Sequence, residues 1–107
     1  MQKNLVRLIG YIGQHLSATT IPTGKRRVHL RVATHQYKLR NGNKEYHTVW
    51  HDVIAWGNIA EYAERSFVKG SKVMVEGSIE YLTYPDHTGH IRYVTQIFAQ
   101  SLLNLDR

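Results

Sequence analysis

The sequence contains no cysteine and only two prolines, Pro22 and Pro85, among its 107 residues. The absence of cysteine excludes disulfide frameworks, cysteine-based zinc sites and thiol nucleophiles, and it fits a reducing compartment. No apolar run approaches the roughly 18 to 20 residues of a membrane-spanning helix, and the start of the chain is not typical of a signal peptide. We therefore expect a cytoplasmic protein with no membrane partner.

Acidic residues are absent from the first 44 positions of the chain. Nine Lys and Arg residues precede Glu45, whereas five basic and eight acidic residues make up the charge from Glu45 onward, and the total is +6. A concentration of positive charge attracts polyanions such as nucleic acid, an anionic membrane surface or an acidic protein. The alternative is a basic protein without such a partner.

No internal repeat, low-complexity tract or linker-like stretch divides the chain. Hydrophobic residues make up 42% and charged residues 21% of the sequence, which is close to an average folded chain and far from a disordered one. The length is that of one ordinary domain. The sequence therefore predicts a single domain over residues 1–107.

Alternating side chains predict that the chain is mostly β-structure. In residues 27–32 the basic positions Arg27, His29 and Arg31 alternate with apolar positions, which indicates a half-buried strand with a basic outer face. The turn signal Asn41-Gly42-Asn43 predicts a hairpin between this strand and the next. Further strands are predicted over residues 5–12, 46–56, 72–82 and 91–99.

One helix is predicted after the third strand. Asn58 is a candidate N-cap, Glu61 can reach back to the cap from three positions on, and Gly70 is the predicted stop, which gives about 12 helical residues. The resulting order is β-β-β-α-β-β. This order is typical of the all-β OB-fold, a five-stranded Greek-key barrel with one α-helix between strands 3 and 4.

The third predicted strand carries both tryptophans of the chain, Trp50 and Trp56, on one face. Because Val49, Val53 and Ala55 on the other face suit a core, the tryptophan face is the candidate exposed one. Exposed aromatic rings on a basic domain are what a single-strand binder needs, since every base has a face on which to stack. The alternative for either tryptophan is a place inside the barrel or in an oligomer interface.

Tyrosines and basic residues add further candidates for base stacking and phosphate contact. Tyr84 beside the last turn is favoured over Tyr81 and Tyr93, for which cross-strand packing is an equal alternative. Tyr37 has cationic neighbours in the sequence. These cations and the earlier basic cluster, whose alternative is a solvated face, are Lys25, Arg26, Arg27, Arg31, Lys38 and Arg40.

The residues give no support for metal or cofactor binding, or for catalysis. His47 and His51 share a strand face but lie about 13 Å apart at 3.3 Å per residue, too far to bind one ion. The sequence shows no nucleophile elbow, no phosphate-binding glycine loop and no close acidic pair. We therefore expect no enzyme activity, no metal and no cofactor.

The sequence resembles the bacterial single-stranded DNA-binding protein family over residues 4 to about 105. The resemblance is carried by Asn4-Leu5-Val6-Arg7-Leu8-Ile9-Gly10-Tyr11-Ile12-Gly13-Gln14, by Trp50-His51-Asp52-Val53-Ile54-Ala55-Trp56-Gly57 and by Lys69-Gly70-Ser71-Lys72-Val73-Met74-Val75-Glu76-Gly77. It implies an OB-fold that assembles as a homotetramer, with a dimer possible. It also implies sequence-independent binding and protection of single-stranded DNA in replication, recombination and repair, in the cytoplasm at the nucleoid.

The resemblance assigns roles to individual residues. Trp50, Trp56 and Tyr84 match stacking aromatics, Tyr37 lies within one position of a fourth, and His51 matches an interface histidine for which a role within one subunit is the alternative. With the basic candidates above, Lys69 completes the predicted DNA-binding set. The predicted oligomer interface consists of His51, Leu5, Arg7 and Ile9.

Three departures from the family pattern qualify these expectations. Basic residues of better-known members are replaced at five positions, namely Asp52, Asn58, Glu80, Leu82 and Thr83. Lys25, Arg26, Arg27 and Arg31 stand where those members are largely neutral, so we expect the cationic track to have moved. The sequence ends without the linker and acidic tip through which members recruit other enzymes, so such recruitment is not expected of this chain, whether it is truncated or short by nature.

Two alternatives remain open at this stage. One is a dimeric OB-fold adaptor like the primosomal replication proteins, whose pattern lacks the tryptophan spacing seen here. The other is a protein-interaction module whose exposed aromatics form an assembly surface.

Overall fold

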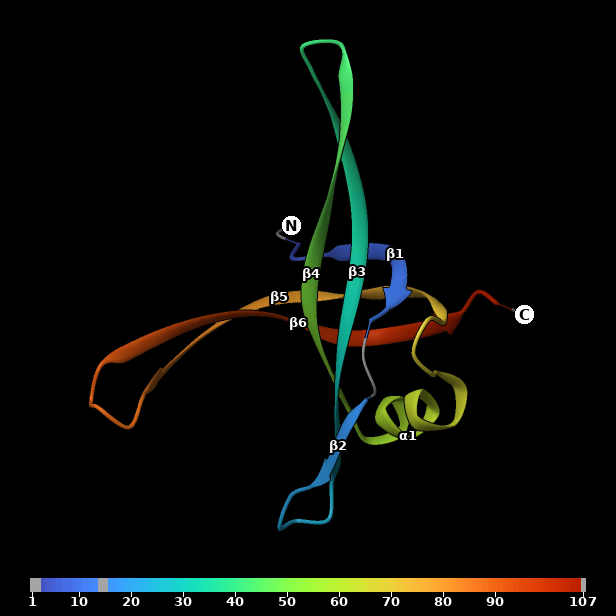
Figure 1. Cartoon of the computed structure of the whole chain (residues 1–107). Helices are drawn as coiled ribbons and strands as arrows, with labels where there is room; N and C mark the ends of the chain where they lie inside the picture. The colour runs from blue at the N-terminus through green and yellow to red at the C-terminus, as the bar shows by residue number, and fades with distance from the viewer. Residues whose placement is uncertain (1–2, 14–15, 107) are drawn as a thin grey trace.

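The computed structural model describes residues 3–13 and 16–106, and Gln14 of the first family-like segment lies outside them. Two long hairpins extend from a small barrel that carries one helix on its side (Figure 1). The elements in chain order are β1 (Val6–Ile12), β2 (Ser17–Thr20), β3 (Arg26–Arg40), β4 (Asn43–Trp56), α1 (Gly57–Ser66), β5 (Lys72–Pro85) and β6 (Ile91–Asn104).

Five of these strands close into the barrel in the order β1-β5-β6-β4-β3, and β1 then pairs with β3. The predicted all-β OB-fold, with its helix between the third and fourth barrel strands, is thereby confirmed. The closing seam is short, since it joins only Tyr11 to Ala33 and Ile12 to Val32. A Cβ atom at Gly10 would overlap the carbonyl oxygen of Ala33, so a glycine at this position lets the two strands approach.

The core lies inside the barrel and under α1. Alternation along β3 and β4 turns Val28, Leu30, Val32, Val53 and Ala55 inward, as the sequence pattern predicts. Ala60 and Ala63 of α1 and the following Phe67 bury against the same cluster. The core thus fixes which faces of β3 and β4 point outward.

The helix differs from its prediction at both ends. It begins at Gly57, and the N-cap position belongs to Trp56, which makes no side-chain capping hydrogen bond; the predicted cap Asn58 lies inside the helix. Gly57 has φ of +60°, which lets the chain turn from β4 into the helix without a capping side chain. The helix ends at Ser66 because Phe67 is extended, with its N–H donating to the carbonyl of Ala63. Gly70 lies beyond it in a separate turn.

The first predicted strand is one residue shorter than expected, since β1 begins at Val6, whereas β3, β4, β5 and β6 all exceed their predicted bounds. The short β2 pairs with the start of β3 and was not predicted, so the sheet has six strands although the barrel has the expected five. The hairpin of β3 and β4 turns through Asn41 and Gly42, both at positive φ, as the turn signal predicts. Its outer part, residues 35–48, is called here the β3–β4 arm, and residues 80–95 form the β5–β6 arm. Neither arm contains a buried residue.

Candidate nucleic-acid interface

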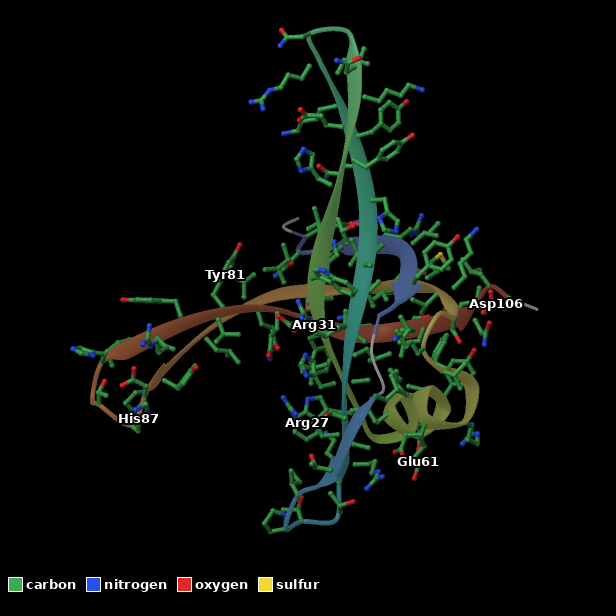
Figure 2. The ribbon with its side chains drawn as sticks, viewed as in Figure 1. Arg27, Arg31, Glu61, Tyr81, His87 and Asp106 are labelled. Atoms are coloured by element: carbon green, nitrogen blue, oxygen red, sulfur yellow. The ribbon has the colours of Figure 1, made fainter. Side chains whose placement is uncertain are left out.

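The basic face of β3 and the tryptophan face of β4 are the same face. In the antiparallel register Arg27 lies opposite Trp56, Arg31 opposite Asp52 and Ala33 opposite Trp50. Residues directly opposite each other point to the same side of a sheet. Arg27, His29, Arg31, Trp50, Asp52 and Trp56 therefore form one surface, the tryptophan face. Figure 2 labels Arg31 and Arg27, which follow each other along the ribbon of β3 and β4.

Exposure varies along the tryptophan face. Trp50 is 44% exposed, Trp56 is half-buried and Ile54 between them is only 3% exposed. Ile54, which lies on the face predicted to be the exposed one, is therefore buried. The reason is that His29 of β3 and Phe98 of β6 lie opposite Ile54 on its two sides.

Each tryptophan on this face has a cation over its ring. The guanidinium carbon of Arg31 lies 5.0 Å from the ring centroid of Trp50. The ring of Trp56 has Lys25 Nζ at 5.4 Å and the guanidinium carbon of Arg27 at 5.8 Å. Such contacts hold cation and ring together, so a base that stacks on either ring comes close to a positive charge that can meet its phosphate.

The backbone of Gly13 positions the ring of Trp50. A Cβ atom at Gly13 would overlap the indole ring, so the ring lies directly against the chain there. The N–H of Gly13 donates to the carbonyl of Arg31 at 3.0 Å, which ties this segment to β3. A ring that is packed on one side by backbone loses less freedom when a base stacks on it.

Asp52 places a carboxylate between the two tryptophans. Its Oδ1 accepts a hydrogen bond from His29 Nε2 at 2.8 Å and lies 3.6 Å from Arg31 Nε. The second distance is too long for a hydrogen bond. Arg31 Nε is buried and has no hydrogen-bond partner among the described residues.

The β3–β4 arm continues the same face with two tyrosines. Tyr37 lies opposite Tyr46, with ring centroids 5.9 Å apart, and Lys44 Nζ lies 5.3 Å from the centroid of Tyr37. The predicted phosphate ligands Lys38 and Arg40 project from the other face of the hairpin, where Lys38 lies opposite Glu45. The cation nearest Tyr37 is thus Lys44, which the sequence reasoning missed. The two-residue turn could have revealed it, because it sets Lys44 opposite Leu39.

The β5–β6 arm carries exposed tyrosines on both faces. Tyr84 lies opposite Arg92, whereas Tyr93 lies opposite Thr83 on the other face, which it shares with Tyr81. Tyr81 projects from the arm in Figure 2.

The tip of this arm is held by Asp86. Arg92 Nε donates to Asp86 Oδ2 at 2.8 Å, so the cation beside Tyr84 is already paired. The hydroxyl and N–H of Thr88 and the N–H of His90 donate to Asp86 Oδ1. The hydroxyl of Thr88, followed by Arg92 and the two N–H groups, lowers the pKa of Asp86.

Two other predicted phosphate ligands lie apart from the aromatic rings. Arg26 donates to both carboxylate oxygens of Glu64 on α1, at 2.6 and 2.8 Å. This hydrogen-bonded pair raises the pKa of Arg26 and lowers that of Glu64. Lys69 is exposed in the loop between α1 and β5.

The predicted interface residues occupy two different surfaces. Leu5 just before β1 and Ile9 on it are exposed, and Arg7 Nη2 pairs with Glu76 Oε2 of β5 at 2.9 Å. His51 lies on the inward face of β4, where its Nε2 is 2.9 Å from the hydroxyl of Thr34. Partial burial lowers the pKa of His51, opposed by the nearby charge of Asp52. The structure therefore does not place His51 beside the outer surface of β1.

A cavity of about 300 Å³ lies beside Trp50 and is lined by residues of β1, β4, β5 and β6. His51 and Asp52 line it together with Val6 and Leu8 of β1. Over residues 3–13 and 16–106, the structure contains no cluster of three metal-ligating side chains. No helix within that part of the chain is long and apolar enough to cross a membrane.

Comparison with known proteins gives one consistent family. The model of the "Single-strand binding protein family" matches residues 3–105. A single-stranded DNA-binding protein of Bacteroides thetaiotaomicron is 34% identical over 95% of this chain and 65% of its own length. Single-stranded DNA-binding protein 1 of Chlorobaculum tepidum is 32% identical over 92% of this chain and 62% of its own. The chain thus spans slightly less than two thirds of either relative.

Among solved structures, that of a Plasmodium falciparum SSB in complex with ssDNA superposes with a TM-score of 0.91. It is 23% identical, and the match covers 99% of this chain and 97% of that one. At this level of sequence identity, the structural similarity shows that the two chains share a fold.

Proposed function

The chain belongs to the single-strand binding protein family, and from that premise we propose that its 107 residues act as one OB-fold unit that binds single-stranded DNA without sequence specificity. Such binding protects exposed strands in replication, recombination and repair. The observation that carries the proposal is the tryptophan face, where Trp50 and Trp56 each have a cation over the ring.

The proposed mechanism combines base stacking with phosphate contact. Bases stack on Trp50 and Trp56, each worth roughly 1 to 3 kcal/mol, without regard to base identity. Arg31, Arg27 and Lys25 meet the phosphates beside the stacked bases, which makes binding dependent on salt. No bond is made or broken, and we propose that the protein is not an enzyme.

The strand path extends from this face along the β3–β4 arm. Tyr37 supplies a further stacking ring and Lys44 the adjacent cation. Tyr84 contributes a ring from the β5–β6 arm. In this path Arg26 holds the start of β3 to α1 through Glu64 and contributes little to phosphate binding.

We also propose that the protein assembles with copies of itself, as a homotetramer or a dimer, through the exposed outer surface of β1. Leu5 and Ile9 there are 60% and 53% exposed, so both offer apolar side chains to a second copy. A cytoplasmic location at the nucleoid follows from the proposed ligand.

Tryptophan fluorescence tests the proposal directly. Titration with oligo-dT is expected to quench the emission of Trp50 and Trp56, and a duplex of equal length is expected to quench it far less. A separation-based assay supplies the binding curve. Absence of binding to the single strand would reject this function and favour a protein-interaction module, whose aromatics would not respond to DNA.

A further inference from the structure

We propose that Asp52 is an internal counter-ion that occupies the place of a DNA phosphate on the tryptophan face of the free protein and limits the affinity for single-stranded DNA. This inference rests on the proposed function. Strand binding then proceeds by exchange: a phosphate takes over Arg31 and His29, the two groups that Asp52 contacts, and the carboxylate is left facing a polyanion.

The position of Asp52 is the first argument. It lies between Trp50 and Trp56 on the tryptophan face, and it also lines the cavity next to Trp50. Its side chain is 41% exposed. A strand stacked on both rings must therefore pass a negative charge that lies between them, two residues from Trp50 and four from Trp56.

The contacts of Asp52 are the second argument. Its Oδ1 holds His29 at 2.8 Å, but it lies 3.6 Å from Arg31 Nε, a buried donor that has no hydrogen-bond partner among the described residues. A buried donor without a hydrogen-bond partner is destabilising. A phosphate oxygen can approach Arg31 from the strand side and satisfy it, which the carboxylate does not do.

The charge balance of the face is the third argument. Three cations, Lys25, Arg27 and Arg31, lie around the two rings. Among the described residues of β3 and β4 on this face, Asp52 is the only one with a carboxylate. Two unit charges about 8 Å apart still interact in bulk water, and they interact more strongly near a protein surface. One carboxylate here therefore changes affinity measurably.

The test compares two variants that remove one negative charge each. Asp52→Asn keeps the size of the side chain and an oxygen that can accept from His29. Glu61→Gln removes the same charge from the exposed surface of α1, which Figure 2 shows on a different part of the molecule from Arg31. Binding of oligo-dT is measured for wild type and both variants at several salt concentrations.

We expect Asp52→Asn to bind threefold to tenfold more tightly at low salt, with a steeper dependence of log K on log salt by about 0.7, the value of one added phosphate contact. Glu61→Gln is expected to stay within twofold of wild type. Arg31→Gln should also weaken binding by a larger factor in the Asp52→Asn background than in wild type, because only there is Arg31 free of its counter-ion.

Several results would overturn the inference. If Asp52→Asn binds oligo-dT as wild type does or more weakly, the role of Asp52 is to hold His29 in place. If Glu61→Gln gains as much affinity as Asp52→Asn, the gain comes from the net charge of the protein and not from the position of Asp52. If either result is found while oligo-dT binds to wild type and quenches its tryptophan emission, only the inference about Asp52 fails. If wild type does not bind, the proposed function fails with it.

A second measurement needs no variant. In wild-type protein the Nε2–H signal of His29 is followed by NMR while oligo-dT is added. Exchange predicts that this signal shifts as DNA binds, since the Asp52 hydrogen bond is replaced. A signal that stays in place in the DNA-bound protein would contradict the exchange.

Discussion

The two arms carry the same aromatic residue type but differ in electrostatics. Both are exposed hairpins that extend from the barrel in different directions (Figure 1). The β3–β4 arm has three cations and one carboxylate, a net charge of +2, from Lys38, Arg40, Lys44 and Glu45. The β5–β6 arm has one cation and two carboxylates, a net charge of −1, from Arg92, Glu80 and Asp86.

The difference extends to how the cations are used. Lys44 lies over the ring of Tyr37 in the β3–β4 arm, whereas Arg92 in the β5–β6 arm is bonded to Asp86. We infer that the first arm couples stacking to phosphate contact, and that the second offers stacking alone. We therefore expect the two arms to contribute to affinity with different sensitivity to salt.

The largest effect is expected at the base of the β3–β4 arm. Replacing Trp50 by Ala should weaken oligo-dT binding by roughly 1 to 3 kcal/mol, because a packed stacking platform is lost. Tyr81→Ala is the matched aromatic deletion at the base of the β5–β6 arm and should cost less. Equal losses in a binding titration would erase the distinction between the two arms.

Tyr84→Ala should have the next largest effect. We expect a loss of about 1 kcal/mol, at the lower end for stacking on one ring. Since Arg92 beside it is paired with Asp86, the slope of log K against log salt should stay as in wild type. A reduced slope would mean that the β5–β6 arm also delivers a phosphate contact.

Lys44→Gln tests whether the β3–β4 arm supplies a phosphate contact that the β5–β6 arm lacks. It should lower the salt slope by about 0.7, the value of one phosphate contact to a single strand. Arg92→Gln removes the same charge from the β5–β6 arm and is expected to leave the slope unchanged. The proposed strand path along the β3–β4 arm would have to be abandoned if only Arg92→Gln altered the slope.

The smallest effect on binding is expected from Asp86→Asn, which should instead loosen the tip of the β5–β6 arm. Hydrogen exchange of the Thr88 and His90 amides should accelerate, because both N–H groups donate to the Asp86 carboxylate. The pKa of Asp86 is lowered in the folded chain, so its stabilising contribution is complete above its ordinary value of 3.8. That contribution is lost as pH falls through the lowered pKa. Exchange rates that match wild type would contradict this role.

The barrel strands could be predicted from the sequence because the alternation of apolar and polar residues follows directly from burial of one strand face. The helix start and β2 could not, because backbone conformation and strand pairing determine them rather than a pattern of side chains. Gly57 starts the helix by its backbone conformation and displaces the expected cap Asn58, and the four residues Ser17–Thr20 of β2 are too few and too polar to show a strand pattern.

The candidate site was predicted in its residue types more than in its contacts. Trp50 and Trp56 follow from alternation, but the pairing of Arg31 with Asp52 requires the strand register. The engagement of Arg26 by Glu64 joins positions 38 residues apart, which no local pattern encodes.

The pairing of β1 has a consequence for synthesis on the ribosome. Its partner residues on β5 lie 61 to 71 positions further along the chain, and its contact with β3 covers two residue pairs. At about 5 to 20 residues per second, the nascent β1 waits about 3 to 14 seconds for β5 to be made. During that interval Leu8 and Ile12 have no barrel to enter, so the barrel cannot close before β5 has been made.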